Sequence, residues 1–193
     1  MKKGSWSMGR IENLVARYKN HIATPWQKNL AGDQKTIFVV YPETEERRLR
    51  ARLPLFEIAT VRTGHRWKAF DFTRTFSTWM AQVEYKEIYF EEPDSISMKL
   101  HSDFLRYAAD QLLRALTAEG VDENTVVAVY GVASLYGLAK VSLLLKEVVH
   151  EIRGRLVLFF PGEYENNHYR LLDARDNWNY LAVPITCQDD MND

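Results

Sequence analysis

This sequence has few of the residues that mark a disulfide-stabilised, metal-binding or membrane-spanning protein. Cys187 is the only cysteine in 193 residues, so no disulfide forms within the chain and no multi-cysteine zinc site can be built. The five histidines are scattered without the spacing of metal ligands. The most apolar stretch, VSLLLKEVV, is interrupted by Lys146 and Glu147 and is too short to span a bilayer. These absences favour a soluble protein of a reducing cytoplasm.

The chain also lacks a charge of one sign. Its 25 basic and 26 acidic residues leave a net charge of -1, which gives no bulk attraction to nucleic acid or to an anionic membrane. The length suits one domain. The start, MKKGSWSMGR, lacks the apolar centre of a signal peptide. We therefore expect a single domain over residues 1–193, ordered from about residue 8 to 186, with a frayed leader and a disordered tail.

Apolar runs alternate with helical spacings along the chain. Such a spacing appears first at Ile11, Leu14, Val15, Tyr18 and Ile22, and another falls in FSTWMAQVEYKEIYFEE. The alternation predicts an α/β fold with a mostly parallel central sheet flanked by helices, Rossmann-like or P-loop-like. Pro54 is expected to divide the second helix, and Pro184 to confine the last strand to an edge. The helix after Gly131 is expected to run from about Leu135 to about Arg153. The five predicted strands are KTIFVVYP, RWKAFDFT, NTVVAVYG, RLVLFFPGE and NYLAVPI.

The turn at Gly131 is the first place to test for a nucleotide site. A phosphate loop needs two glycines at fixed spacing, followed directly by Lys and then Ser or Thr. Gly131 and Gly137 are one residue too far apart, and Leu138 and Ala139 stand where the lysine and hydroxyl should be. We therefore predict no functional nucleotide-binding loop: Gly131 permits a turn, and Gly137 lets the helix pack closely. Weak binding of an anion or nucleotide at the helix start stays open.

Three further residues fall where α/β proteins place catalytic groups. Asp71, Ser134 and Glu163 lie at or just after predicted strand ends. The nucleophile motif G-x-S-x-G fails on both sides of Ser134, and the two carboxylates are predicted to cap neighbouring turns. Cys187 is predicted to be a spectator thiol in the tail. No catalytic, cofactor-binding or metal-binding residue is predicted, and a divergent nucleotide-binding hydrolase using these three residues stays open as the alternative.

Two segments are rich in residue types that favour binding surfaces. The helix EERRLRAR carries several arginines, but neighbouring glutamates nearly balance them, so a DNA-binding module is the less favoured reading. The segment FPGEYENNHYRLLDARDNWNYLAVPI gathers aromatic residues around turn-formers. It is either a loop pinned over the sheet edge or a docking surface. The candidate partner-binding residues are Arg48, Arg52, Tyr164, Tyr169, Trp178 and Tyr180.

Three segments together resemble the BrxB family of the bacteriophage exclusion (BREX) defence systems, long carried as a domain of unknown function. They are spread over most of residues 35–185. The last is the most specific, because a strand ending in Phe-Pro-Gly-Glu precedes an Asn-Tyr-x-Ala-x-Pro-Ile strand. The three segments are IFVVYPETEERRLRARLPL, VVAVYGVASLYGLAKVSLLLKEV and LVLFFPGEYENNHYRLLDARDNWNYLAVPI.

The resemblance implies a small cytoplasmic bacterial protein that serves phage resistance, an antiviral defence, through protein–protein interaction. It would be a non-enzymatic component encoded beside a large ATPase, an alkaline-phosphatase-like protein and an adenine methyltransferase. It would contact those partners directly, nucleic acid only through them, and no membrane. The family brings no catalytic residue and no cofactor. Which subunit is bound, the stoichiometry and self-association stay open.

Overall fold

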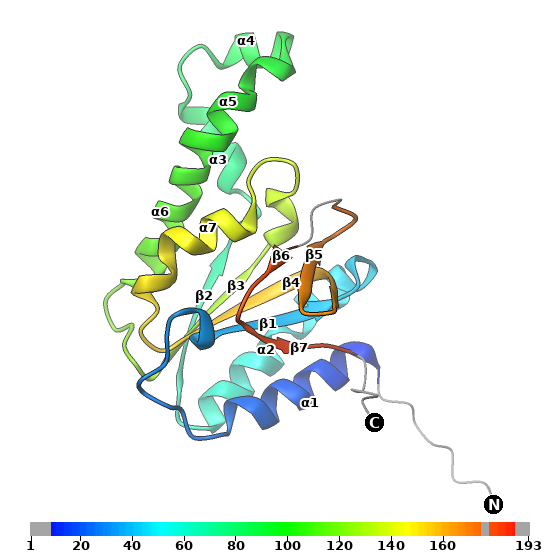
Figure 1. The fold of residues 1–193 in the computed structure, drawn as a ribbon, viewed down its shortest axis with the longest axis vertical. Coiled ribbons are helices and arrows are strands. Elements are labelled where there is room, and N and C mark those ends of the chain that lie inside the picture. Colours follow the sequence, from blue (N-terminus) through cyan, green and yellow to red (C-terminus); the bar gives the residue numbers. More distant parts are fainter. Residues whose placement is uncertain (1–8, 175–177, 188–193) are drawn as a thin grey trace, which may run out of the picture.

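A seven-stranded mixed sheet organises the residues that this computed structural model describes, 9–174 and 178–187, into an α/β fold (Figure 1). The strand order is β2-β3-β4-β1-β7, and β5 and β6 continue from β4. All pairs along the main path are parallel, whereas β4–β5 and β5–β6 are antiparallel. The strands are β1 (Thr36–Tyr41), β2 (Arg66–Asp71), β3 (Thr125–Tyr130), β4 (Arg155–Glu165), β5 (His168–Leu171), β6 (Trp178–Asn179) and β7 (Val183–Ile185).

The strands in the middle of the sheet are those with continuous apolar sequence. β1 is buried along its whole length, and β3 and β4 are buried along most of theirs, because helices cover both faces. β2 exposes most of its side chains at one edge. At the other edge β7 pairs only with β1, with Pro184 opposite Phe38. The prediction that Pro184 marks an edge strand is confirmed.

Two helices cover one face of the sheet. They are α1 (Arg10–Ile22) and α2 (Glu46–Arg62), which lie below the sheet in Figure 1. The predicted helical spacing of the first is confirmed, since its buried side chains recur every three or four residues. Tyr18 and Phe56 join the two helices, with ring centroids 5.2 Å apart, and Phe56 also meets Phe159 of β4 edge to face. The Tyr18 and Thr60 hydroxyls share a 2.6 Å hydrogen bond in this core.

The expected break of the second helix at Pro54 is wrong. α2 runs continuously through it, although proline removes one backbone donor from the helix. Pro54 lies on the exposed side, where a local distortion of the helix is tolerated. Leu49 and Phe56, on either side of the proline, are both fully buried in the same core, so packing holds the two halves in line.

The other face is covered by α3 (Thr75–Gln82), α6 (Leu105–Leu116) and α7 (Val141–Val148). The chain enters α6 through α5 (Ser97–Lys99) and a π-helical turn, η4 (Leu100–Phe104). The helical segment expected over FSTWMAQVEYKEIYFEE is divided, because Tyr85 adopts a left-handed conformation, φ 57°. Beyond it, α4 (Lys86–Glu91) and η3 (Pro93–Ile96) stand away from the sheet, at the top of Figure 1.

The helix after β3 starts later and ends earlier than expected. A short 3-10 turn, η5 (Val132–Leu135), follows Gly131, and α7 begins only at Val141. Gly137 lies between them with φ +72° and open space around the position of a Cβ atom. Its predicted role in close helix packing is therefore wrong, since this glycine supplies a second left-handed turn. Another 3-10 turn, η6 (Val149–Glu151), ends the helical stretch before the expected residue 153.

The fourth strand is longer than predicted and turns into a hairpin. β4 pairs with β1 as far as Pro161 and then continues past the sheet edge to pair with β5. The turn between β4 and β5 is Asn166-Asn167, both with positive φ. Two adjacent asparagines are a known signal for a tight hairpin, so the sequence carried this information.

The expected leader and tail fall mainly at residues 1–8 and 188–193, which lie outside the described residues. Cys187 is described, and its assignment to a disordered tail is wrong. Its side chain is half-buried against the core beside β1, with Sγ 3.9 Å from the Val40 carbonyl oxygen. Burial raises the pKa of this thiol. No helix in residues 9–174 and 178–187 combines the length and apolarity needed to cross a bilayer.

We expect Phe56→Ala to lower the free energy of unfolding by about 3–5 kcal/mol, because it opens a cavity between α1, α2 and β4. The neighbouring Leu55→Ala is the matched control. Leu55 is 39% exposed, so its loss should cost less than about 1 kcal/mol. Urea unfolding of both variants measures the difference, and equal losses would contradict the assignment of α2's buried face.

Candidate functional site

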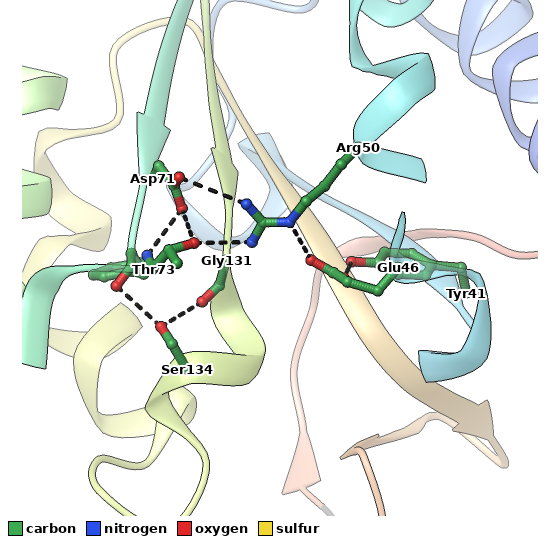
Figure 2. Close-up of polar contacts among 8 residues, drawn as sticks. Tyr41, Glu46, Arg50, Asp71, Thr73, Gly131 and Ser134 are labelled. Atoms are coloured by element: carbon green, nitrogen blue, oxygen red, sulfur yellow. Dashed lines mark hydrogen bonds and ion pairs between the residues drawn. The ribbon is translucent and has the colours of Figure 1, made fainter. Parts of the chain in front are cut away.

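The carboxyl ends of the parallel strands form the edge at which open α/β sheets bind their ligands. In this protein a side chain from α2 crosses that edge. Figure 2 shows Arg50 extended between the end of β2, marked by Asp71, and the start of α2, where Glu46 lies beside Tyr41 of β1. One guanidinium group therefore brings together the ends of β1, β2 and β3. We call this group of contacts the Arg50 network.

Arg50 uses all of its guanidinium nitrogens in the network. Nε donates to Glu46 Oε1 at 2.7 Å, Nη2 donates to Thr73 Oγ1 at 2.9 Å, and Nη1 lies 3.7 Å from Asp71 Oδ2. The guanidinium carbon also lies 5.5 Å from the ring centroid of Tyr130, at the end of β3. The side chain is 34% exposed, so it closes the edge from the solvent side.

The Asp71 carboxylate accepts hydrogen bonds within its own turn and also forms an ion pair with Arg50. Its Oδ1 accepts from the Thr73 backbone N–H at 2.9 Å and from the Thr73 hydroxyl at 2.5 Å. The Thr73 hydroxyl thus receives a hydrogen bond from Arg50 and passes one to Asp71 (Figure 2). The prediction that Asp71 caps a neighbouring turn is confirmed.

Tyr41 and Glu46 form the other end of the network. The Tyr41 hydroxyl donates to Glu46 Oε2 at 2.5 Å, while the second carboxylate oxygen accepts from Arg50. Burial and then the Glu46 charge raise the pKa of Tyr41, so its hydroxyl stays a donor. Partial burial of Arg50 works against its charge, but the Glu46 hydrogen bond and charge outweigh it and raise the pKa of Arg50. Both raised pKa values keep the proton where it is needed, on the Tyr41 hydroxyl and on the Arg50 guanidinium.

Gly131 is required by the close approach of the β2 and β3 turns. Its φ is +73°, and a Cβ atom there would overlap the Asp71 carboxylate and lie 2.8 Å from the Thr73 nitrogen. The predicted turn at Gly131 is confirmed, with a close approach that the sequence did not reveal. Ser134 ties the same two turns together, since its hydroxyl lies 3.0 Å from the Phe72 carbonyl oxygen and 2.7 Å from that of Gly131.

The three residues of the hydrolase alternative do not converge. Asp71 and Ser134 contact adjoining turns, but both are engaged with the protein's own groups. Glu163 lies inside the extended β4 instead of following it, and it forms an ion pair with Arg170 on β5. The prediction that it caps a turn is wrong, because the strand continues through it.

The aromatic candidates for partner binding lie on the hairpin, on β6 and just after β6. Tyr169 is fully buried and packs edge to face on Phe38, with centroids 4.4 Å apart, so it offers no surface in this structure. Tyr164, Trp178 and Tyr180 are partly buried and pack against the same core. The view of this segment as a cover pinned by its own aromatics fits this packing, and a docking role for the three partly buried residues stays a prediction.

The arginine candidates lie on the outer side of α2. Arg48 and Arg52 both pair with Glu12 of α1, at 3.2 and 3.3 Å. This agrees with the ion-paired, solvated face that the sequence predicted, and it leaves less free positive charge for a nucleic-acid backbone. Whether either residue contacts a protein partner stays a prediction.

A cleft of about 680 Å³ opens at the start of α7. It lies between the β3–α7 loop, the start of α7 and the hairpin, and sequence reasoning missed it because it depends on how the hairpin folds back. In the parts of the chain that the structure describes, no three His, Cys, Asp or Glu side chains gather as metal ligands would. Residues lining the cleft include His101, Tyr136, Lys140, Ser142, Leu171 and Trp178.

Comparison with known proteins finds no match: no protein-family profile, no curated protein and no solved structure matches this chain. The site is therefore interpreted from its own geometry. Its central feature, Arg50, was not singled out from sequence, because four arginines share the helix EERRLRAR and only the fold distinguishes them.

Two glycines in one loop allow a matched test of the close approach. Gly131→Ala should cost about 3–4 kcal/mol of unfolding free energy, because it adds a clash with Asp71 and Thr73 to the strain of a positive φ. Gly137→Ala has the same φ strain but open space, so about 1–2 kcal/mol is expected. Chemical denaturation measures both, and equal costs would contradict the close packing of the two turns.

Proposed function

We propose that this protein is a non-enzymatic adaptor of a bacterial BREX anti-phage complex, which binds the alkaline-phosphatase-like subunit, the large ATPase or both in the cytoplasm. The adenine methyltransferase is a further candidate partner, and nucleic acid is reached only through these subunits. The sequence resemblance to the BrxB family supplies the identity of the partners. A second line of support comes from the edge of the sheet where this fold usually binds its ligand.

The observation that carries the proposal is the Arg50 network. The edge where an α/β sheet normally receives a ligand holds a guanidinium bonded to Glu46, Asp71 and Thr73. A phosphate or substrate entering there would have to displace these contacts and leave two carboxylates facing its own negative charge. A protein whose strand ends are filled in this way is better suited to binding partners through its outer surface than to catalysing a reaction at the sheet edge.

We regard the domain as Rossmann-like or P-loop-like without a functional nucleotide-binding loop. Leu138 occupies the place of the phosphate-binding lysine, and Gly137 turns the chain away before α7 begins. Lys140, the first basic residue after the turn, stands at the N-cap of α7.

The adaptor is tested by co-expression and co-purification with the phosphatase-like and ATPase subunits. We expect a stable complex with at least one of them, surviving size-exclusion chromatography. Arg50→Ala should leave the complex intact if the network serves the fold alone. Failure of the intact protein to bind either subunit, singly or together, would remove the support for an adaptor.

The alternative is a divergent nucleotide-binding hydrolase, and the cleft at the start of α7 is the observation that favours it. A volume of about 680 Å³ falls in the range of small-molecule sites. Tyr136 and Trp178 could stack on a base, and Lys140 and the first amides of α7 could meet a phosphate. A third reading, a DNA-binding module, has only the arginines of α2 in its favour.

A thermal-shift screen with ATP, ADP and GTP plus Mg²⁺ separates the adaptor from the hydrolase. If the protein is an adaptor, we expect that adding nucleotide leaves its Tm unchanged. A nucleotide at 100 times its Kd would add about 2.7 kcal/mol, which raises Tm by several degrees for a chain of this size. A shift of that size, lost in Trp178→Ala and retained in the exposed control Leu181→Ala, would favour the hydrolase.

A further inference from the structure

The segment from Glu84 to Lys99, which we call the tip, exposes large apolar side chains that the fold does not use. Tyr85 is 69% exposed, Ile88 52%, Phe90 66% and Met98 82%. They are four of the ten exposed large apolar residues in the part of the chain that the structure describes. A cluster of this kind on one projecting element is typical of a protein-interaction site.

The tip is held in place by its inner side. Tyr89 and Ile96 pack against the core beneath α3 and α6. Lys86 Nζ donates to the Ala81 carbonyl oxygen at 3.3 Å, and Lys99 pairs with Asp103 at 3.7 Å in the helical stretch that leads into α6. The exposed side chains are therefore presented by an ordered support, which lowers the entropy lost when a partner binds.

The tip also carries an unbalanced negative charge. Residues 84–99 hold five carboxylates and two lysines, and none of these carboxylates forms an ion pair with a described residue. Phosphates of nucleic acid and anionic lipid headgroups would be repelled. The matching surface is one that combines positive charge with apolar contacts. The carboxylates are those of Glu84, Glu87, Glu91, Glu92 and Asp94.

The arrangement of the apolar residues constrains the shape of that surface. Ile88 and Phe90 are two residues apart on α4, which places them about 200° apart around the helix axis. Tyr89, between them, faces the core. A flat partner could cover only one of the two, so burying both requires a groove that receives the helix.

We propose that the tip is the docking element of this protein and that it inserts into a basic groove with apolar walls on a larger protein partner. The inference rests on the adaptor function proposed above and adds which part of the chain makes the contact. The other conceivable occupant is a second copy of this chain, whose α2 exposes Leu55, Ile58 and Val61 beside Arg62.

The test measures affinity of the full chain for the purified phosphatase-like and ATPase subunits by biolayer interferometry. The apolar variant is Ile88→Ser/Phe90→Ser, with Leu55→Ser/Val61→Ser as its control on α2. The charge variant is Glu87→Lys/Glu91→Lys, with Glu119→Lys/Glu123→Lys as its control. Tip variants should keep the wild-type Tm, because none of the changed side chains is buried.

We expect the apolar tip variant to lose at least about 30-fold in affinity, as hot-spot residues do, while its control binds as wild type. The charge variant should weaken binding and flatten its dependence on salt. Tip variants that bind like the wild type would overturn the docking role and leave the adaptor intact. A wild type that binds neither subunit would remove both. A homodimer in light scattering that dissociates on Ile88→Ser/Phe90→Ser would replace the proposed partner with a second copy.

Discussion

Arg50 reaches from α2 over the carboxyl edge of the sheet and bonds simultaneously to residues that follow β1 and β2. Each contact is modest in a half-exposed setting. Their joint effect is geometric, because α2, the β2 turn and the β3 turn are fixed to one another at the place where this fold usually keeps a cavity. Gly131 permits the close approach, and Ser134 ties the turns from the other side.

In the adaptor proposed above, this constraint leaves binding to the exposed features of the molecule. The β4–β5 hairpin covers the neighbouring part of the edge with Tyr169 packed on Phe38 and Phe160. The tip stands clear of the sheet with apolar side chains and uncompensated carboxylates. A filled sheet edge and a projecting acidic segment are the two features on which the proposed adaptor function rests. The cleft between the β3–α7 loop and the hairpin favours a small ligand instead.

Much of the fold followed from local patterns, and most of the site did not. Apolar runs located the strands of the parallel path, and helical spacing located α1, because burial on one or both faces dictates those patterns directly. The predicted helix break at Pro54 is wrong, because the packing of Leu49 and Phe56 in the core outweighs the free-energy cost of a proline inside a helix. The hairpin was missed because the two adjacent asparagines, Asn166 and Asn167, were not read as a turn with positive φ. Arg50 could not be distinguished from its neighbours, because its partners are brought to it only by the order of strands in the sheet.

The protein's own charges occupy the carboxyl edge of the sheet, and we predict that this edge takes no nucleotide. The most direct measurement is an NMR titration of the labelled protein with Mg²⁺–ATP, following the backbone amides of Thr73 and Gly131 and the Arg50 side-chain Nε–H. The account predicts that all three signals stay in place up to millimolar nucleotide. Saturable shifts of these signals, with release of the Arg50 Nε–H to exchange with water, would contradict it.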